Sequence, residues 1–255
     1  MPPLPTTSCP KLECVDISKA YGEDGILADV SLKLHKGEVV AILGASGSGK
    51  STLLKIISGL VMPDKGSVYI DGADCTGKTG MTSFMLQDSL LFPWKTVLEN
   101  IILPLIISGM KRERAEAKAR EYLEQFGLSG CEKLYPAQIS GGMARRVSLL
   151  RAYMFSSGIL LLDEPFSSLD SITRIAIYEW FRQIVDELSI STLLITHDVS
   201  EAVYLADRVH VIKGRPASLS FTLDIDIEKQ SYPQSLTSSS FLHSVSTLQE
   251  ALTNP

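Results

Sequence analysis

The stretch GASGSGKS, residues 44–51, has residue types that suit the binding of phosphate groups. Its spacing matches G-x-x-x-x-G-K-[ST], in which glycines admit phosphate oxygens to backbone N–H groups, lysine supplies positive charge and serine can bind Mg²⁺. The apolar run EVVAIL (38–43) precedes it and the helix-like run STLLKII (51–57) follows it. The sequence therefore predicts a phosphate-binding loop formed by Gly44, Ala45, Ser46, Gly47, Ser48, Gly49, Lys50, Ser51 and Thr52.

A pair of carboxylates, Asp163 and Glu164, follows the continuous apolar run ILLL (159–162). Ligands of open parallel sheets lie at the carboxyl ends of the strands, so Asp163 is expected to face the phosphate loop and to bind Mg²⁺. Side chains alternate along a strand, so Glu164 is expected to point elsewhere and to orient or deprotonate a water molecule. A water-activating glutamate favours hydrolysis over phosphoryl transfer to a metabolite.

Two further stretches contain polar groups at positions that suit phosphate chemistry. His197 ends the apolar run TLLIT (192–196) at the same predicted sheet edge, where we expect it to contact or orient groups near a terminal phosphate. Ser140, Gly141 and Gly142 stand directly before a helix-like run. Because a helix N-terminus presents unpaired N–H groups, these three residues predict a second anion-binding position.

The composition is that of an ordinary globular protein. Of the 255 residues, 45% are hydrophobic and 21% are charged, which fits one large α/β domain or two small ones. The net charge of −5 and the lack of a basic run disfavour nucleic-acid binding. The four cysteines are scattered, as expected for reduced thiols, and the longest apolar run, 101–110, is too short to span a bilayer.

The pattern of apolar residues divides the chain into regions. Short strand-like runs fill residues 11–80, interrupted by one helix that begins at Lys50, and the pattern becomes helical from about 88 to 157. Buried strands then alternate with helices, which indicates a mostly parallel sheet. A serine-rich tail follows, in which we expect a short helix over 241–252.

Taken together, these motifs resemble the ATP-binding subunit of ABC transporters over about residues 11–215. The resemblance rests on GASGSGKS, LQD with Gln87, ISGGM, ILLLDEP, SSLD ending at Asp170, and THD with His197, in that order. It implies an α/β fold with a P-loop NTPase (RecA-like) core, an N-terminal antiparallel β subdomain and an inserted helical subdomain at about 88–157. Residues 216–255 would form a C-terminal extension.

The resemblance also implies roles for single residues. Tyr21 would stack on adenine, Gln87 would join Ser51 and Asp163 at the Mg²⁺ site, and Asp170 would sense the second site of a dimer. Ser140, Gly141 and Gly142 would contact ATP bound to the other subunit, and Glu164 and His197 would be catalytic. From the residues alone, Tyr21 could instead be a turn or core residue, Gln87 a surface residue and Asp170 a helix N-cap.

A family of this kind implies ATP and Mg²⁺ as ligands and a particular set of partners. These are a second copy or close paralogue, a separate integral membrane permease and, indirectly, a substrate-binding protein, with this chain peripheral on the cytoplasmic face of the membrane. The stretches 91–105 and 198–209 resemble the nitrate, sulfonate and taurine importers, a group that includes carriers of vitamin-precursor pyrimidines. The chain departs from that group at Ile139, Ala144 and Arg145.

Two other functions compete with an importer subunit. A soluble ABC-type ATPase of DNA repair would need a long coiled coil, and the sequence has no sustained heptads. A P-loop kinase of a small metabolite would share the phosphate loop, but the Asp163–Glu164 pair and the ISGGM motif argue against it. Phosphate release without an added acceptor would distinguish hydrolysis from kinase activity.

Overall fold

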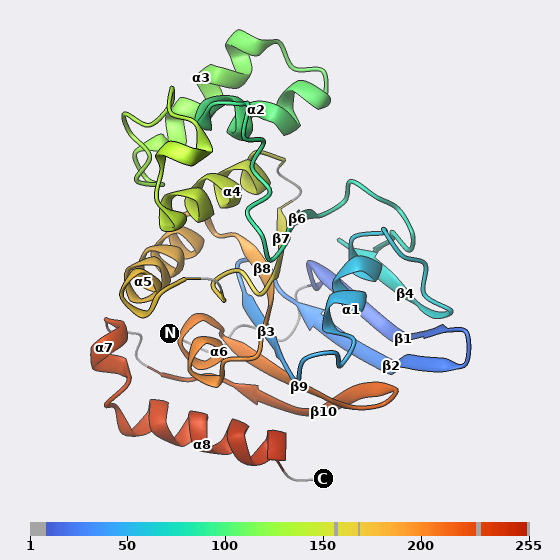
Figure 1. Cartoon of the computed structure of the whole chain (residues 1–255). Coiled ribbons are helices and arrows are strands. Elements are labelled where there is room, and N and C mark those ends of the chain that lie inside the picture. Colours follow the sequence, from blue (N-terminus) through green and yellow to red (C-terminus); the bar gives the residue numbers. More distant parts are fainter. Residues whose placement is uncertain (1–8, 156–157, 168, 228–230, 254–255) are drawn as a thin grey trace.

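The computed structural model describes residues 9–155, 158–167, 169–227 and 231–253, shown as a ribbon in Figure 1. Ser168 of the SSLD motif lies outside these residues. The strands of the described chain form one sheet, in the order β5-β4-β1-β2-β10-β9-β3-β8-β7-β6. Their bounds are β1 Leu12–Tyr21, β2 Asp24–Leu34, β3 Val39–Leu43, β4 Lys65–Ile70, β5 Ala73–Asp74, β6 Ser83–Met85, β7 Ile159–Asp163, β8 Ser191–Thr196, β9 Arg208–Gly214 and β10 Ala217–Asp224.

The sheet has a parallel part and an antiparallel part. Strands β9, β3, β8, β7 and β6 are parallel neighbours, whereas β2, β1, β4 and β5 pair antiparallel. Strand β10 pairs antiparallel with β9 and meets β2 through the single parallel pair Ala217 and Leu27, so it joins the two parts. This arrangement confirms the predicted α/β fold with a parallel core and an antiparallel N-terminal portion.

The parallel strands are continuous apolar runs because helices cover both of their faces. Every residue of β3 and β8 is buried. In the register of the sheet, Leu43 lies opposite Thr196, and Asp163 lies opposite Ile195. The ends of β3, β7 and β8 therefore meet at one edge, where the phosphate loop, the carboxylate pair and His197 follow their strands.

Figure 1 shows one set of helices at the top of the molecule, α7 and α8 at the bottom, and the remaining helices between them. Helices α2, α3 and α4 form the top set and lie between β6 and β7 in the sequence, within the expected helical insertion. A capping box between Thr96 and Glu99 fixes the start of α2. The bounds are α1 Lys50–Ile57, α2 Val97–Ile107, α3 Arg112–Leu123, α4 Gly141–Phe155, α5 Ser171–Leu188, α6 Val199–Leu205, α7 Tyr232–Ser235 and α8 Ser239–Thr253, with a 3-10 turn at Pro136–Gln138.

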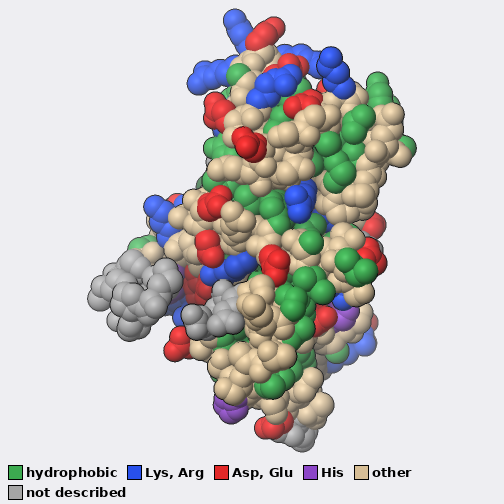
Figure 2. Space-filling model, turned by 90° about the vertical axis from the view of Figure 1, so that its left-hand side faces the viewer, with side chains coloured by type: hydrophobic (Ala, Val, Ile, Leu, Met, Phe, Trp, Pro, Cys, Tyr) green, Lys and Arg blue, Asp and Glu red, His purple; other side chains and the backbone are tan. Residues whose placement is uncertain are grey.

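The surface of the top set is highly charged. Figure 2 shows Lys, Arg, Asp and Glu side chains gathered there, over α3. Arg112 donates to Glu116 at 2.8 Å across one turn of α3. This is the arrangement of a solvent-facing helix, in which charged pairs contribute little to stability.

Residues 216–255, which we expect to form a C-terminal extension, contribute β10, α7 and α8 to the described structure. Helix α8 is amphipathic and buries Phe241 and Leu248 against the main core. It contacts α6, β9 and β10. Within the described residues no helix combines the length and apolar character needed to cross a membrane.

Candidate nucleotide-binding site

A cavity of about 300 Å³ opens at the carboxyl edge of β3 and β7. The phosphate loop lines one side, and the two carboxylates and Gln87 line the other. The lining consists of Ile26, Ser46, Gly47, Gly49, Lys50, Ser51, Thr52, Gln87, Asp163 and Glu164. Residues predicted from three separate motifs therefore surround one space, and Ile26 of β2 is a member that the sequence did not suggest.

Lys50 lies at the base of this cavity with only 4% of its surface exposed. Its ammonium donates to the carbonyls of Gly44 at 2.9 Å and Ala45 at 2.6 Å. Burial lowers the pKa of Lys50, and the negative charges of Glu164 and Asp163 oppose that shift. The lysine thus fixes the loop from within while its charge faces the space that phosphates would fill.

Two glycines of the loop are required by close contacts. A Cβ on Gly44 would lie 2.7 Å from the carbonyl oxygen of Ile212 in β9. Gly49 has φ +88°, and a Cβ there would lie 2.9 Å from the side chain of Ile26. The glycine pattern therefore lets the loop pack against β2 and β9 while its backbone curves around the cavity.

Ser51 and Asp163 bring two oxygen ligands together across the cavity. The Ser51 hydroxyl donates to Asp163 Oδ1 at 3.1 Å. Burial raises the pKa of Asp163, the hydrogen bond from Ser51 lowers it and the charge of Glu164 raises it. A partly buried carboxylate beside a hydroxyl is a donor set that suits a hard divalent cation.

The expected direction of Glu164 is wrong. Strand β7 ends at Asp163, and Glu164 has φ +45°, in the left-handed region, with its N–H donating to the Ile195 carbonyl at 3.0 Å. This turn breaks the alternation of the strand, so the side chain of Glu164 lines the same cavity as that of Asp163. Such conformations cost free energy and cluster at functional sites.

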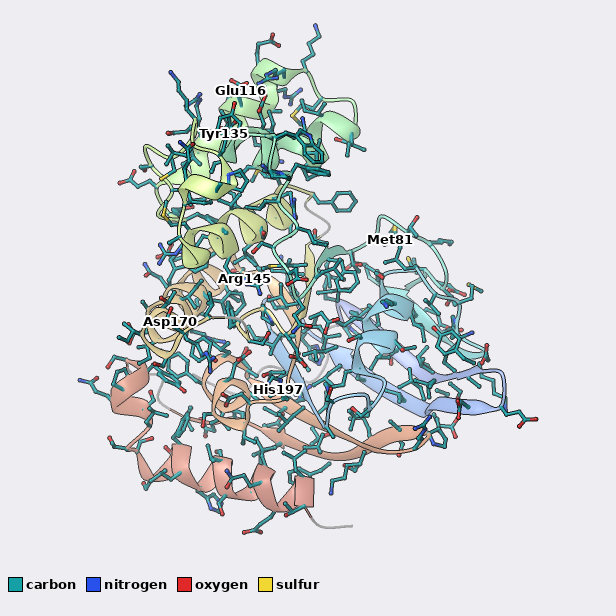
Figure 3. The ribbon with its side chains drawn as sticks, in the orientation of Figure 1. Met81, Glu116, Tyr135, Arg145, Asp170 and His197 are labelled. Carbon is teal, nitrogen blue, oxygen red and sulfur yellow. The ribbon has the colours of Figure 1, made fainter. Side chains whose placement is uncertain are left out.

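His197 lies beside Glu164, since β7 and β8 are neighbours in the sheet. Its Nδ1 is 3.1 Å from Glu164 Oε2. The imidazole side chain is 57% exposed, whereas the glutamate side chain is only 20% exposed. Figure 3 shows His197 near the centre of the molecule, at the end of the parallel strands. This contact places the histidine where it can hold the carboxylate of Glu164 in one orientation.

A hydroxyl that the sequence analysis did not single out, that of Ser167, connects Gln87 to the carboxylate pair. The Gln87 amide Nε2 donates to the hydroxyl of Ser167 at 3.4 Å, and that hydroxyl donates to the carbonyl of Glu164 at 3.1 Å. Ser167 is therefore the link between Gln87 and the carboxylate pair. Its place in SSLD, three residues after Glu164, is the signal that could have suggested it.

Tyr21 lies at the end of β1, and 53% of its surface is exposed. The Lys19 ammonium stands 5.5 Å from the centre of its ring. The residues that line the 300 Å³ cavity do not include Tyr21, so its predicted stacking on adenine stays a prediction.

A second cavity of about 310 Å³ adjoins the phosphate loop on its other side. Ala45, Ser46, Gly47 and Ser48 line it together with residues 212–215 and Leu252 of α8. The end of the C-terminal helix therefore lies close to the phosphate loop, which the sequence pattern did not predict.

The ISGGM motif lies apart from both cavities. Ser140 and Gly141 are exposed at the start of α4, where the Ser140 hydroxyl accepts from the Met143 N–H at 3.2 Å. A Cβ on Gly142 would lie 2.9 Å from Thr173 of α5, so this glycine permits α4 and α5 to approach. The motif faces outward and does not line the cavity that holds Lys50.

Asp170 is the N-cap of α5 and accepts from the N–H groups of Ile172 and Thr173. Hydrogen bonds from the side chain and backbone of Thr173 hold the pKa of Asp170 below its ordinary value. Figure 3 places Asp170 at the side of the molecule, at the start of α5. The capping role is therefore present, and a role between subunits stays a prediction.

Comparison with known proteins identifies the family. The family model described as "ABC transporter" matches residues 27–167, more than half of the chain. This chain belongs to the ABC transporter family. The matched residues include the phosphate loop, Gln87, the ISGGM motif and the carboxylate pair.

Curated relatives of this ABC protein are ATP-binding proteins of importers. It is 38% identical to the aliphatic sulfonates import protein SsuB of Bacillus thuringiensis subsp. konkukian, covering 88% of this chain and 87% of the relative. It is 41% identical to the formylaminopyrimidine import protein ThiZ of Halalkalibacterium halodurans, with 79% of each chain covered. It is 38% identical to the nitrate import protein NrtD of a Synechocystis strain, covering 85% and 83%.

A solved structure of an ABC transporter cassette is also similar to this chain. The dimeric structure of MJ0796, a bacterial ABC transporter cassette, matches 85% of this chain and 100% of that cassette, with a TM-score of 0.73 and 31% identity. The resemblance to the nitrate and sulfonate importer group is thereby confirmed. The chain is an ABC importer ATPase, and its reaction is ATP hydrolysis.

Proposed function

We propose that this chain drives uptake of a small molecule through a separate membrane permease, with two copies closing over two ATP molecules. The observation that carries the proposal is the cavity in which Lys50, Gln87, Asp163 and Glu164 meet. The relatives point to nitrate, an aliphatic sulfonate or a formylaminopyrimidine as the transported substrate.

The residues at the cavity fit a magnesium ion. Ser51 and Asp163 place two oxygens 3.1 Å apart, and the carbonyl oxygen of the Gln87 amide can supply a third ligand. When bound, Mg²⁺ neutralises charge on the β- and γ-phosphate oxygens of ATP.

The chain's own residues supply the remaining chemistry. The Lys50 ammonium and the loop N–H groups bind and orient the phosphates. Glu164 accepts a proton from a water molecule while that water's oxygen bonds to the γ-phosphorus. The bond to the bridging oxygen breaks, and ADP leaves with the electron pair. His197 holds the carboxylate of Glu164 in the required orientation, 3.1 Å away.

The second anion-binding position requires a partner subunit. Ser140 and Gly141 are exposed at the N-terminus of α4, where helix N–H groups attract negative charge. In the proposed dimer these residues bind the γ-phosphate held by the other copy, and Asp170 lies between the two sites. The dimeric structure of the related cassette supports this arrangement.

The permease contact lies near the segment that follows Gln87. Phe92 and Trp94 pack with ring centres 5.3 Å apart, and Trp94 is largely exposed. Exposed aromatic side chains of this kind are frequent anchors in protein interfaces. We place the chain as a peripheral protein on the cytoplasmic face of the membrane, with the permease bound at this surface and a substrate-binding protein acting on the permease.

Replacement of the proposed base tests the function. The variant Glu164→Gln keeps the shape of the side chain but cannot take a proton at neutral pH, so kcat for ATP is expected to fall by about 10² to 10⁴. ATP binding should persist, since the phosphate loop is intact. The measurement is phosphate release from ATP with Mg²⁺ and without an added acceptor, together with nucleotide affinity.

The matched control is Glu121→Gln on α3, where the side chain is exposed and belongs to the top set of helices. This control should hydrolyse ATP at the wild-type rate. Near-normal hydrolysis by Glu164→Gln would contradict the proposal. Turnover by the wild type only after a small-molecule acceptor is added would instead indicate a kinase.

A further inference from the structure

One face of α4 contacts the segment 88–90, which directly follows Gln87. Ser148 and Arg151 are one helical turn apart and project toward the same side. Both contribute to a cavity of about 250 Å³ whose other walls include Asp88 and Leu90. The helix that begins with the ISGGM motif is therefore also the helix against which the segment after Gln87 packs.

The contacts between them are specific hydrogen bonds to the backbone. The Ser148 hydroxyl donates to the Ser89 carbonyl at 2.7 Å, and Ser148 is 1% exposed. The Arg151 guanidinium donates to the same carbonyl at 2.8 Å and to the Leu90 carbonyl at 2.9 Å. Two side chains thus satisfy two consecutive carbonyls, with one oxygen shared between them.

The segment they hold has a backbone conformation that needs support. Leu90 has φ +41°, a value that non-glycine residues rarely adopt and that strains the backbone. Hydrogen bonds on both the Ser89 and the Leu90 carbonyls stabilise this turn. Loss of these hydrogen bonds would let the segment 88–90, which lies within three residues of Gln87, change its backbone conformation.

We propose that Ser148 and Arg151 are positioning residues that fix the segment 88–90 and thereby hold Gln87 at the nucleotide cavity. This inference rests on the proposed function, in which Gln87 contributes to the ATP and Mg²⁺ site. Helix α4 begins at Gly141, so the helix that holds the segment 88–90 also carries the ISGGM motif at its start.

Arg145 extends the same face of α4 toward Asp88. It is 3% exposed, lies one turn before Ser148, and the charge of Asp88 partly offsets the burial that lowers its pKa. Figure 3 shows Arg145 on the side of α4 that faces the sheet. The charge of Arg145 therefore acts on Asp88, the residue directly after Gln87.

A double-mutant cycle tests whether Arg151 acts through Gln87. Arg151→Met, Gln87→Ala and the double variant are compared with the wild type for kcat and KM in ATP hydrolysis. Arg151→Met alone should lower kcat by about 10-fold with KM unchanged, which is the scale of a small misplacement of a positioned group. In the Gln87→Ala background the same change should lower kcat no further.

The matched control is Arg146→Met on the same helix, where the guanidinium stacks on Trp180 at 4.7 Å and contacts a different region. Its effect should be additive with Gln87→Ala. If Arg151→Met does not fold, Ser148→Ala takes its place in the cycle, and Arg151→Lys should restore part of the lost turnover. An unchanged kcat for Arg151→Met, or the same loss in both backgrounds, would overturn the inference.

Hydrogen exchange separates failure of this inference from failure of the proposed function. Residues 87–91 should exchange faster in Arg151→Met than in the wild type or in Arg146→Met, whether or not the protein hydrolyses ATP. If the wild type hydrolyses no ATP, the proposed function is wrong. Unchanged exchange at 87–91 in Arg151→Met would overturn the positioning role of Ser148 and Arg151, whatever the rate of ATP hydrolysis.

Discussion

Single residues at the site show how far local conformation controls chemistry. Asp163 and Glu164 are adjacent in the chain, yet both line one cavity because Glu164 leaves the strand with φ +45°. That conformation also brings Glu164 within 3.1 Å of His197, from the neighbouring strand. The proposed base is therefore oriented by a residue 33 positions away in sequence but adjacent in the sheet.

Removal of His197 should impair turnover without impairing nucleotide binding. His197→Ala leaves the phosphate loop intact but frees the Glu164 carboxylate to leave its orientation, so kcat is expected to fall by about 10-fold or more, with little change in ATP affinity. The check is steady-state ATP hydrolysis. The control His243→Ala, at an exposed position of α8, should behave as the wild type. Equal turnover in His197→Ala and His243→Ala would contradict the role of His197 in orienting Glu164.

Much of the site could be predicted from residue types and spacing. Lys50, Ser51 and Asp163 meet because the phosphate loop and the carboxylate follow β3 and β7, two parallel strands that flank β8 and end at the same edge of the sheet. The apolar runs that precede both motifs are visible in the sequence. The direction of Glu164 could not be predicted, because a positive φ at a non-glycine residue leaves no mark in residue types. The role of Ser167 was not predicted, because it depends on the path of the backbone in the turn after Glu164.

At the scale of helices and strands, the sequence pattern predicts individual helices but does not predict which strands pair. Asp170, which the sequence offered as a helix N-cap, is the N-cap of α5, and the expected tail helix over 241–252 lies within α8. The pairing of β10 with both β9 and β2 was not predicted. Strand order depends on contacts between residues far apart in the chain, and periodicity along one segment does not encode it.

A buried carboxylate on α6 makes the stability of the fold depend on pH. Glu201 is 4% exposed and accepts a hydrogen bond from the Tyr178 hydroxyl of α5 at 2.7 Å. Burial raises the pKa of Glu201 from 4.5 to about 7, and the hydrogen bond from Tyr178 opposes that shift. The folded state therefore retains a proton on Glu201 over a range in which the unfolded chain has lost it.

This difference predicts a fall in the free energy of unfolding as pH rises from about 5 to about 8. The raised pKa means that the stabilising protonated form is complete at low pH and is lost as pH passes about 7. The fall attributable to Glu201 is about 3 kcal/mol. Urea unfolding at several pH values measures it. Glu201→Gln should flatten this part of the curve, and an identical slope in the variant would contradict the assignment.

At the scale of the whole molecule, one sheet joins a phosphate-binding core, an antiparallel portion and a top layer of helices (Figure 1). The cavity that holds Lys50 and the exposed ISGGM motif belong to different parts of this arrangement. A single copy therefore contains one complete phosphate loop and one outward-facing ISGGM motif. We propose that the ISGGM motif completes the nucleotide site of another copy. The related cassette MJ0796 is dimeric.

The most direct test of this account is the oligomeric state of Glu164→Gln with ATP, measured by size-exclusion chromatography with light scattering. Because this variant should bind ATP without hydrolysing it, we expect a stable dimer that dissociates when ATP is removed. Adding Ser140→Arg places a bulky side chain where the second copy's nucleotide would lie, so the double variant should remain a monomer that still binds ATP. Full dimerisation of the double variant with ATP would contradict the account.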